Sequence, residues 1–178
     1  MAEYKLRDGR VLTLRQARGT DAAACLDYLR CVGGESDYLL VGPGGLRDVT
    51  EAQEAELLEA RFDSAEGRLY LGFVGEELVC IASVETRRHA RLSHNATMGL
   101  SVRRRFWGLG IGSVCMELLI RFCRAHGGVR SLRLEVYADN ERAIRLYKKF
   151  GFSVEGCRKR YLCVNGVYHD ELLMCLML

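Results

Sequence analysis

The feature that most constrains the fold is a glycine-rich stretch that leads directly into an amphipathic helix. Glycines alternate at Gly108, Gly110 and Gly112. Apolar residues then recur three and four positions apart, as on one face of a helix, at Ile111, Val114, Cys115, Leu118, Leu119 and Phe122. Glycines let backbone N–H groups approach a ligand, and a helix N-terminus adds the positive end of its dipole. The pattern therefore predicts a cradle for a diphosphate.

Other glycine loops explain this stretch less well. A Walker loop needs Lys followed by Ser or Thr after its last glycine, but Ser113 and Val114 stand here. A dinucleotide fingerprint, G-x-G-x-x-G, would need glycine where Ser113 stands, although Glu135 lies about where the ribose-binding acid of that fold would be. That alternative stays open, as does a turn without a ligand.

Periodicity and turn signals predict a single mixed α/β domain over residues 1–178. Helices are expected over 22–32 with Asp21 as cap, from the Thr50–Gln53 capping box to 62, from 111 to Gly127, and from about 139 to Gly151. Strands are expected over 11–14, 69–74, 78–84, 97–102, 131–137 and 172–178, and one more strand is expected to end at about 164. A long loop is expected over 33–48, and a hairpin turn at Asn165-Gly166. The last strand is apolar without alternation, so both of its faces are expected to be covered.

Composition excludes several classes of protein. A chain of 178 residues suits one domain with a sizeable core, and its net charge of +3 is too small for a dedicated nucleic-acid binder. No apolar run is long enough to cross a bilayer, and the polar N-terminus does not look like a signal peptide. The eight cysteines form no C-x-x-C pair. We therefore expect reduced cysteines, no metal site, no membrane and a cytoplasmic location.

Two motifs together resemble those of the GNAT superfamily of N-acyltransferases. The stretch from Val102 to Ser113 is similar to its acetyl-CoA-binding motif, Q/R-x-x-G-x-G/A, with Trp107 in the Q/R position. Trp there is similar to the branch of ribosomal-protein N-terminal and spermidine acetyltransferases. About 30 residues later, the second motif, N-x-x-A-x-x-x-Y-x-x-x-G-F, is matched at Asn140, Ala143, Tyr147, Gly151 and Phe152. The resemblance is clearest over 68–178.

The resemblance implies an α/β (α+β) fold and a cosubstrate site. The sheet would be mixed and mostly antiparallel, flanked by helices, with a central splayed pair of parallel strands near 97–102 and 131–136. The pantetheine of acetyl-CoA would pair with the backbone between them. The residues that would bind CoA are Leu100, Val102, Trp107, Gly108, Leu109, Gly110, Ile111, Gly112, Ser113, Asn140 and Tyr147.

The implied reaction is direct attack of a primary amine on the acetyl group, without a metal. Tyr147 would protonate the leaving thiolate of CoA, since a phenol with a pKa near 10 suits that task. Members of this branch often carry a glutamate as base where Thr97 stands here. Glu85, His94 and a chain of waters are the alternatives for the role of general base. The alternative function is a CoA-binding sensor or subunit of the same fold without turnover.

The acceptor side is less specified by the sequence. Residues 33–40 are similar to the acceptor-side loop of some bacterial members, and Glu35 and Ser36 are the predicted substrate-binding residues. The partner would be a small-molecule or peptide amine, with no nucleic acid, and a homodimer is among the assemblies that the resemblance allows. The run Arg103–Arg105 is either a solvated strand end or attracts the CoA phosphates, and His169-Asp170 is either structural or lines the acceptor cleft.

Overall fold

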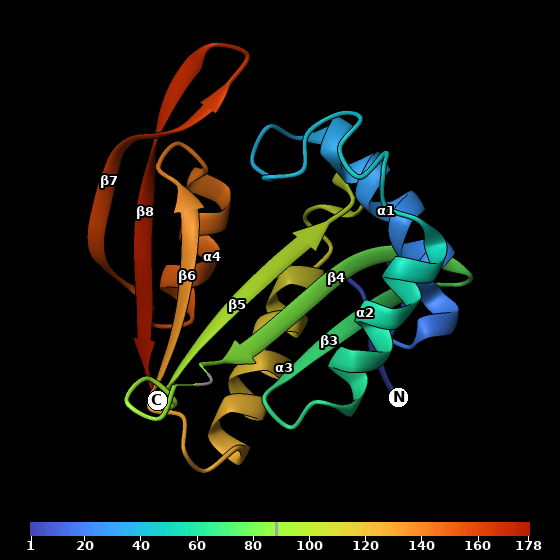
Figure 1. The fold of residues 1–178 in the computed structure, drawn as a ribbon, viewed down its shortest axis with the longest axis horizontal. Coiled ribbons are helices and arrows are strands. Elements are labelled where there is room, and N and C mark those ends of the chain that lie inside the picture. Colours follow the sequence, from blue (N-terminus) through green and yellow to red (C-terminus); the bar gives the residue numbers. More distant parts are fainter. Residues whose placement is uncertain (88) are drawn as a thin grey trace. The chain divides into compact units, whose positions relative to one another are not determined.

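The structure is a computed structural model that describes residues 1–87 and 89–178. Its described residues form an eight-stranded sheet in the order β1-β2-β3-β4-β5-β6-β8-β7, with four α-helices (Figure 1). The helices are α1 (Ala22–Glu35), α2 (Glu51–Asp63), α3 (Ile111–Ala125) and α4 (Glu141–Lys149). The strands are β1 (Ala2–Lys5), β2 (Val11–Gln16), β3 (Gly67–Val74), β4 (Glu77–Thr86), β5 (Asn95–Val102), β6 (Ser131–Tyr137), β7 (Ser153–Val164) and β8 (Val167–Met177). Short 3₁₀ turns are η1 (Gly19–Asp21) and η2 (Arg104–Phe106).

The chain divides into two compact units. Unit 1 comprises Met1–Val84 and Gly99–Cys115, and unit 2 comprises Glu85–Met98 and Met116–Leu178. β5 and α3 each begin in one unit and end in the other. Each unit carries one of the two sequence motifs: the glycine loop belongs to unit 1, and the Asn140–Phe152 motif belongs to unit 2.

Unit 1 is a set of antiparallel strands with α1 and α2 packed on a shared core. β1 pairs with β2, and β2 pairs with β3. Buried side chains from both helices and from β3 form one cluster that includes Cys25, Tyr28, Leu58, Leu69 and Leu71. The predicted capping box opens α2, since the Gln53 N–H donates to Thr50 Oγ1 and the Thr50 N–H donates to Gln53 Oε1.

Unit 2 contains the parallel pair. Asn95–Thr97 of β5 pairs with Ser131–Arg133 of β6 in parallel register, and β6 then pairs with β8 in antiparallel register as far as Tyr137. In Figure 1 β6, β8 and β7 run side by side. The parallel register between β5 and β6 covers three residue pairs and ends at Thr97, shortly before β5 passes into unit 1 at Gly99. The predicted fold class, a mixed and mostly antiparallel sheet with a central parallel pair, is confirmed.

The structure differs from the local expectations at Asp21, at the N-terminus and in the last strand. Asp21 stands at the N-cap of α1, but its carboxylate does not cap that helix. It accepts two hydrogen bonds from Arg15 instead, at 2.6 and 2.7 Å. The strand β1 was not expected, because four residues with alternating exposure carry little periodic signal. Burial of both faces of the last strand holds for Met174–Leu176, whereas Met177 is 71% exposed.

The helix α1 ends three residues later than predicted, and close packing explains why. Gly33 and Gly34 suggested a loop, yet both are helical. A Cβ at Gly33 would lie 2.7 Å from the carbonyl oxygen of Val41. Glycine is therefore used here to let the loop after α1 fold back against the helix.

Candidate functional site

The glycine loop adopts a backbone that side chains would strain. Gly108 and Gly110 have φ values of +84° and +97°, in the region that L-residues rarely adopt. A Cβ at either position would meet no atom within 4 Å. The requirement for glycine therefore comes from backbone conformation and not from crowding. The loop runs straight into α3, which begins at Ile111.

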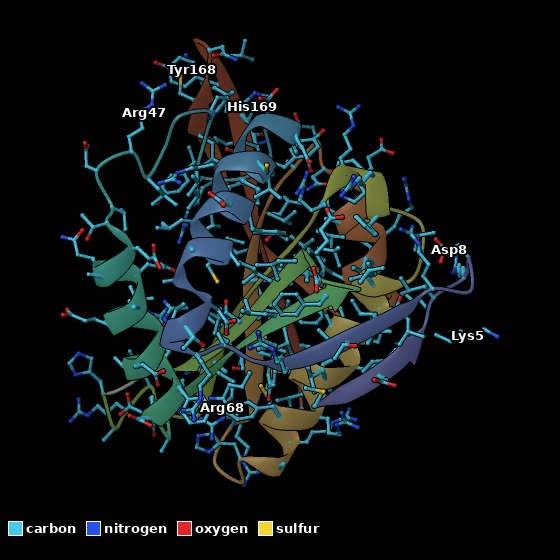
Figure 2. The ribbon with its side chains drawn as sticks, turned by 90° about the vertical axis from the view of Figure 1, so that its right-hand side faces the viewer. Lys5, Asp8, Arg47, Arg68, Tyr168 and His169 are labelled. Carbon is cyan, nitrogen blue, oxygen red and sulfur yellow. The ribbon has the colours of Figure 1, made fainter. Side chains whose placement is uncertain are left out.

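The carbonyl groups of this loop are held by the turn between β1 and β2. The Arg7 N–H donates to the Leu109 carbonyl, and Arg7 Nη1 donates to the Gly108 carbonyl, each at 3.3 Å. Figure 2 labels Asp8, the next residue in the same turn. The first N–H groups of any α-helix have no carbonyl partner within the helix, and the helix dipole adds partial positive charge there. Together these features make the loop suited to bind an anion.

The strand end before the loop is fixed by aromatic residues. Trp107 Nε1–H donates to the Val102 carbonyl at 2.7 Å, and Phe106 is buried. The side chain of Trp107 thus ties the glycine loop to the end of β5. The side chain of Trp107, which stands at the Q/R position of the motif, therefore has a structural role here.

Of the three arginines before the loop, Arg104 and Arg105 are exposed, as expected of a solvated strand end, whereas Arg103 is partly buried. The Arg103 side chain is 18% exposed, and its Nε donates to Glu35 Oε1 at 2.7 Å. Arg103 Nη1 lies 3.6 Å from Glu77, and Arg105 pairs with Glu77 as well. The other oxygen of Glu35 accepts from the Arg104 N–H at 2.7 Å. Arg103 and Arg105 are therefore paired with carboxylates of unit 1.

The electrostatics of Glu35 follow from those contacts. Partial burial acts to raise the pKa of the Glu35 carboxyl, but the hydrogen bonds from the Arg104 N–H and the Arg103 side chain outweigh it and lower the pKa. Glu35 is thus an anion at neutral pH. Its predicted neighbour in the acceptor site, Ser36, accepts from the Tyr38 N–H at 3.2 Å, which begins the loop after α1.

In unit 2, α4 presents the two polar residues of the second motif. Asn140 Oδ1 accepts from the Ala143 N–H at 3.2 Å, so Asn140 is the side-chain cap of α4. Tyr147 is buried, with its ring 6.0 Å from that of Phe152. Burial raises the pKa of Tyr147 to about 12. The phenol is consequently protonated throughout the neutral range and can act as an acid.

The residues considered as base lie at the surface of unit 2. Glu85 and His94 are both exposed. The His94 carbonyl accepts hydrogen bonds from the N–H groups of Arg130 and Ser131. The His94 ring nitrogen Nε2 lies 3.1 Å from Asn95 Nδ2. His94 thus stands at the end of β5 that is paired with β6. Thr97, which stands in place of the expected glutamate, pairs with Arg133 in that register.

One polar pair in unit 2 was not predicted. His169 Nδ1 lies 2.8 Å from Asp139 Oδ2, so the partner of His169 is not its neighbour in sequence. Asp170 pairs with Lys159 instead, and that contact lowers the pKa of Asp170. Tyr168 and His169 are labelled in Figure 2. The partner of His169 lies 30 positions away, beyond the end of β6, where no local pattern could indicate it.

The described ranges, 1–87 and 89–178, contain no group of three or more His, Cys, Asp or Glu side chains arranged to hold a metal ion. None of the helices described there combines the length and the hydrophobicity that crossing a bilayer requires.

The fold and the glycine loop are those expected of an acyltransferase. Comparison with known proteins identifies the family to which the chain belongs. Residues 39–152, more than half of the chain, match the model of the acetyltransferase (GNAT) family. The chain belongs to that family.

Individual relatives support the same assignment. The chain is 36% identical to an L-amino acid N-acetyltransferase of Escherichia coli K12 over 52% of its own length and 57% of the relative. It is 28% identical to a spermidine N(1)-acetyltransferase of the same strain, over 64% of its length and 60% of the relative. The chain thus spans under two thirds of these curated relatives. A GNAT-family acetyltransferase structure from Streptococcus pneumoniae is similar at a TM-score of 0.89 and 27% identity, covering 94% of this chain and 99% of the other.

Proposed function

We propose that this chain is an acetyl-CoA-dependent N-acetyltransferase that transfers an acetyl group to a primary amine of a small molecule or peptide. The observation that carries the proposal is the glycine loop, whose positive φ values and position before α3 suit a diphosphate. Family membership and the names of the relatives, which act on amino acids and on spermidine, support it. In this proposal residues 1–178 act as one acetyltransferase domain.

The loop amides over 108–112 and Ser113 would bind the diphosphate of acetyl-CoA, whereas the predicted Trp107 N–H already donates to the Arg104 carbonyl at 3.1 Å. The backbone of Leu100 and Val102 would pair with the pantetheine. Asn140 would serve both as cap of α4 and as a contact to the cosubstrate. Support for the loop comes from its backbone: the carbonyls of Gly108 and Leu109 are held by Arg7, and the helix that follows contributes its dipole. No side chain need supply charge.

In the reaction, the lone pair of a neutral amine attacks the acetyl carbonyl carbon, and the carbon–sulfur bond then breaks. Tyr147 donates its phenol proton to the leaving sulfur. The nitrogen gives up a proton to Glu85, His94 or water. Holding the two reactants together supplies much of the remaining rate enhancement.

A cytoplasmic location is part of the proposal. Three of the eight free cysteines, Cys31, Cys157 and Cys163, are exposed, which suits a reducing compartment.

The test is turnover with acetyl-CoA and a panel of primary amines that includes amino acids, polyamines and peptide N-termini. Product is detected by the mass of the acetylated amine, because the exposed cysteines would react with a thiol reagent. The proposal predicts product with at least one amine. Binding of CoA without product across the panel would instead favour the non-catalytic CoA-binding function. Absence of CoA binding would contradict both.

A further inference from the structure

We propose that Glu35 is a positioning residue that fixes the glycine loop and the start of the acceptor-side loop at the same time. The inference rests on the proposed function for its two sites, but its structural basis lies entirely in unit 1. In this assignment Glu35 does not bind the acceptor amine itself, and its effect on the amine passes through the loop that follows it.

One carboxylate bridges two consecutive residues 68 and 69 positions away. Glu35 Oε1 accepts from Arg103 Nε, and Oε2 accepts from the Arg104 N–H, both at 2.7 Å. Charge-assisted hydrogen bonds of this length are among the stronger contacts in a folded protein. Each oxygen of Glu35 is thus already committed to a donor of this chain, and its charge is balanced by Arg103. These contacts favour a structural anchor over an open site for a cation.

The anchored segment is the turn from which the glycine loop begins. The Arg103 N–H donates to the Val79 carbonyl at 2.9 Å, which ties the segment to β4. The N–H groups of Phe106 and Trp107 close the η2 turn onto the carbonyls of Arg103 and Arg104. Gly108 follows directly. Because the turn is only three residues long, a shift of its first N–H is passed to the loop.

The other end of the connection is the last residue of α1. Glu35 is followed by the loop that contains Ser36 and that folds back so that the Val41 carbonyl lies close to Gly33. Holding Glu35 therefore holds the point where this loop leaves the helix. A single ion pair would then set the geometry of both the acetyl-CoA site and the acceptor side.

The same helix supplies a matched control at its opposite end. Asp21 stands just before α1, accepts from Arg15 at 2.6 and 2.7 Å, and also accepts from the Arg18 N–H at 2.9 Å. Like Glu35, it joins an arginine side chain and a backbone N–H. Its partners lie in β2 and the segment after it, so Asp21→Asn weakens a comparable anchor without touching the turn before the glycine loop.

The experiment compares Glu35→Gln with Asp21→Asn in the full chain. We expect both to lower Tm by similar amounts. Only Glu35→Gln should raise both the Kd for CoA, by calorimetry, and the KM for the amine, each about ten-fold or more. Arg103→Lys keeps the charge but not the geometry of Nε, and should give the same pattern with a smaller effect. If Glu35→Gln does not fold, Arg103→Lys is compared with Asp21→Asn in its place.

Two results would overturn the proposal. The first is a loss of stability with Kd and KM unchanged, since Glu35 would then be an ordinary anchor. The second is a rise in only one of the two constants, because a change in KM for the amine alone would mean that Glu35 binds the amine directly.

Hydrogen exchange without any ligand separates this inference from the proposed function. We expect residues 36–50 and 104–110 to exchange faster in Glu35→Gln than in Asp21→Asn. Equal exchange in the two variants would contradict the positioning role even if the chain proved to bind no CoA. Faster exchange together with no CoA binding would support the anchor while rejecting the proposed function.

Discussion

Each of the two motifs of this protein is built around one helix, but one motif relies on backbone groups and the other on side chains. In the proposed function, the groups that act before α3 would be backbone amides, and the key residues there would have no side chain: Gly108 and Gly110, whose φ values are positive. On α4, the groups that act would be side chains: Asn140, which caps the helix, and Tyr147, a buried phenol. A site made of backbone groups depends on conformation and tolerates changes of side chain, whereas a site made of side chains is lost when those side chains are replaced.

The largest effect should come from removing one oxygen on the side-chain site. Tyr147→Phe should lower kcat about 10²- to 10⁴-fold while leaving the Kd for CoA almost unchanged, since only the acid is lost. Steady-state kinetics and calorimetry measure the two quantities. Tyr28→Phe is the matched control, because Tyr28 is also buried and donates to Ser101 Oγ at 3.0 Å. Similar kcat losses in both variants would mean that Tyr147 is not the acid.

On the backbone site, conformation should matter more than side-chain chemistry. Gly110→Ala should raise the Kd for CoA about ten-fold or more, because alanine resists a φ of +97°. It should also lower the free energy of unfolding by about 1–2 kcal/mol. Gly75→Ala imposes comparable strain in the β3–β4 turn, where φ is +60°. Calorimetric binding that weakened equally in both variants would show that the effect is global.

The buried phenol should also leave a signature in the pH dependence of stability. The unfolded chain releases this proton near pH 10, whereas Tyr147 in the folded protein holds it to about pH 12. Stability is therefore lost as pH rises through this window, by about 2–3 kcal/mol at its upper end. Denaturant melts from about pH 9 to 12 should show a steeper decline for the wild type than for Tyr147→Phe. Parallel curves would mean that the phenol is not buried as described.

The smallest effect is expected where a side chain of the glycine loop is changed. Trp107→Gln introduces a residue of the family pattern and should alter the Kd for CoA by less than about three-fold, since the amides do the binding. It should still lower the free energy of unfolding by about 1 kcal/mol or more, because the hydrogen bond to the Val102 carbonyl and the packing of the ring are lost. A loss of CoA affinity as large as that of Gly110→Ala would remove the distinction between the two motifs.

Local signals in the sequence predicted most of the elements. Apolar runs and turn residues located the β3–β4 and β7–β8 hairpins, and the Thr50–Gln53 pair located the start of α2. Several features that were missed depend on contacts that no periodicity or turn pattern indicates. Asp21 follows the pattern of a helix cap, but Arg15 competes for its carboxylate with two charged hydrogen bonds.

The candidate site shows the same difference between features with a local sequence signal and features without one. The glycine loop and the α4 motif are each contained in one short stretch, so their residues could be read directly. The pairs Glu35–Arg103 and His169–Asp139 join residues 68 and 30 positions apart, and neither has a local pattern. Gly33 suggested a helix end, whereas its role is to admit the Val41 carbonyl, a contact set by the path of the following loop.

The most direct test of the central claim is a calorimetric titration of the full chain with CoA and, separately, with pantetheine, which lacks the diphosphate and the adenosine 3′-phosphate attached to it. If the loop amides hold the diphosphate, CoA should bind in the micromolar range and pantetheine at least about 100-fold more weakly. Equal affinity for the two compounds, or no heat with CoA at millimolar concentration, would contradict it.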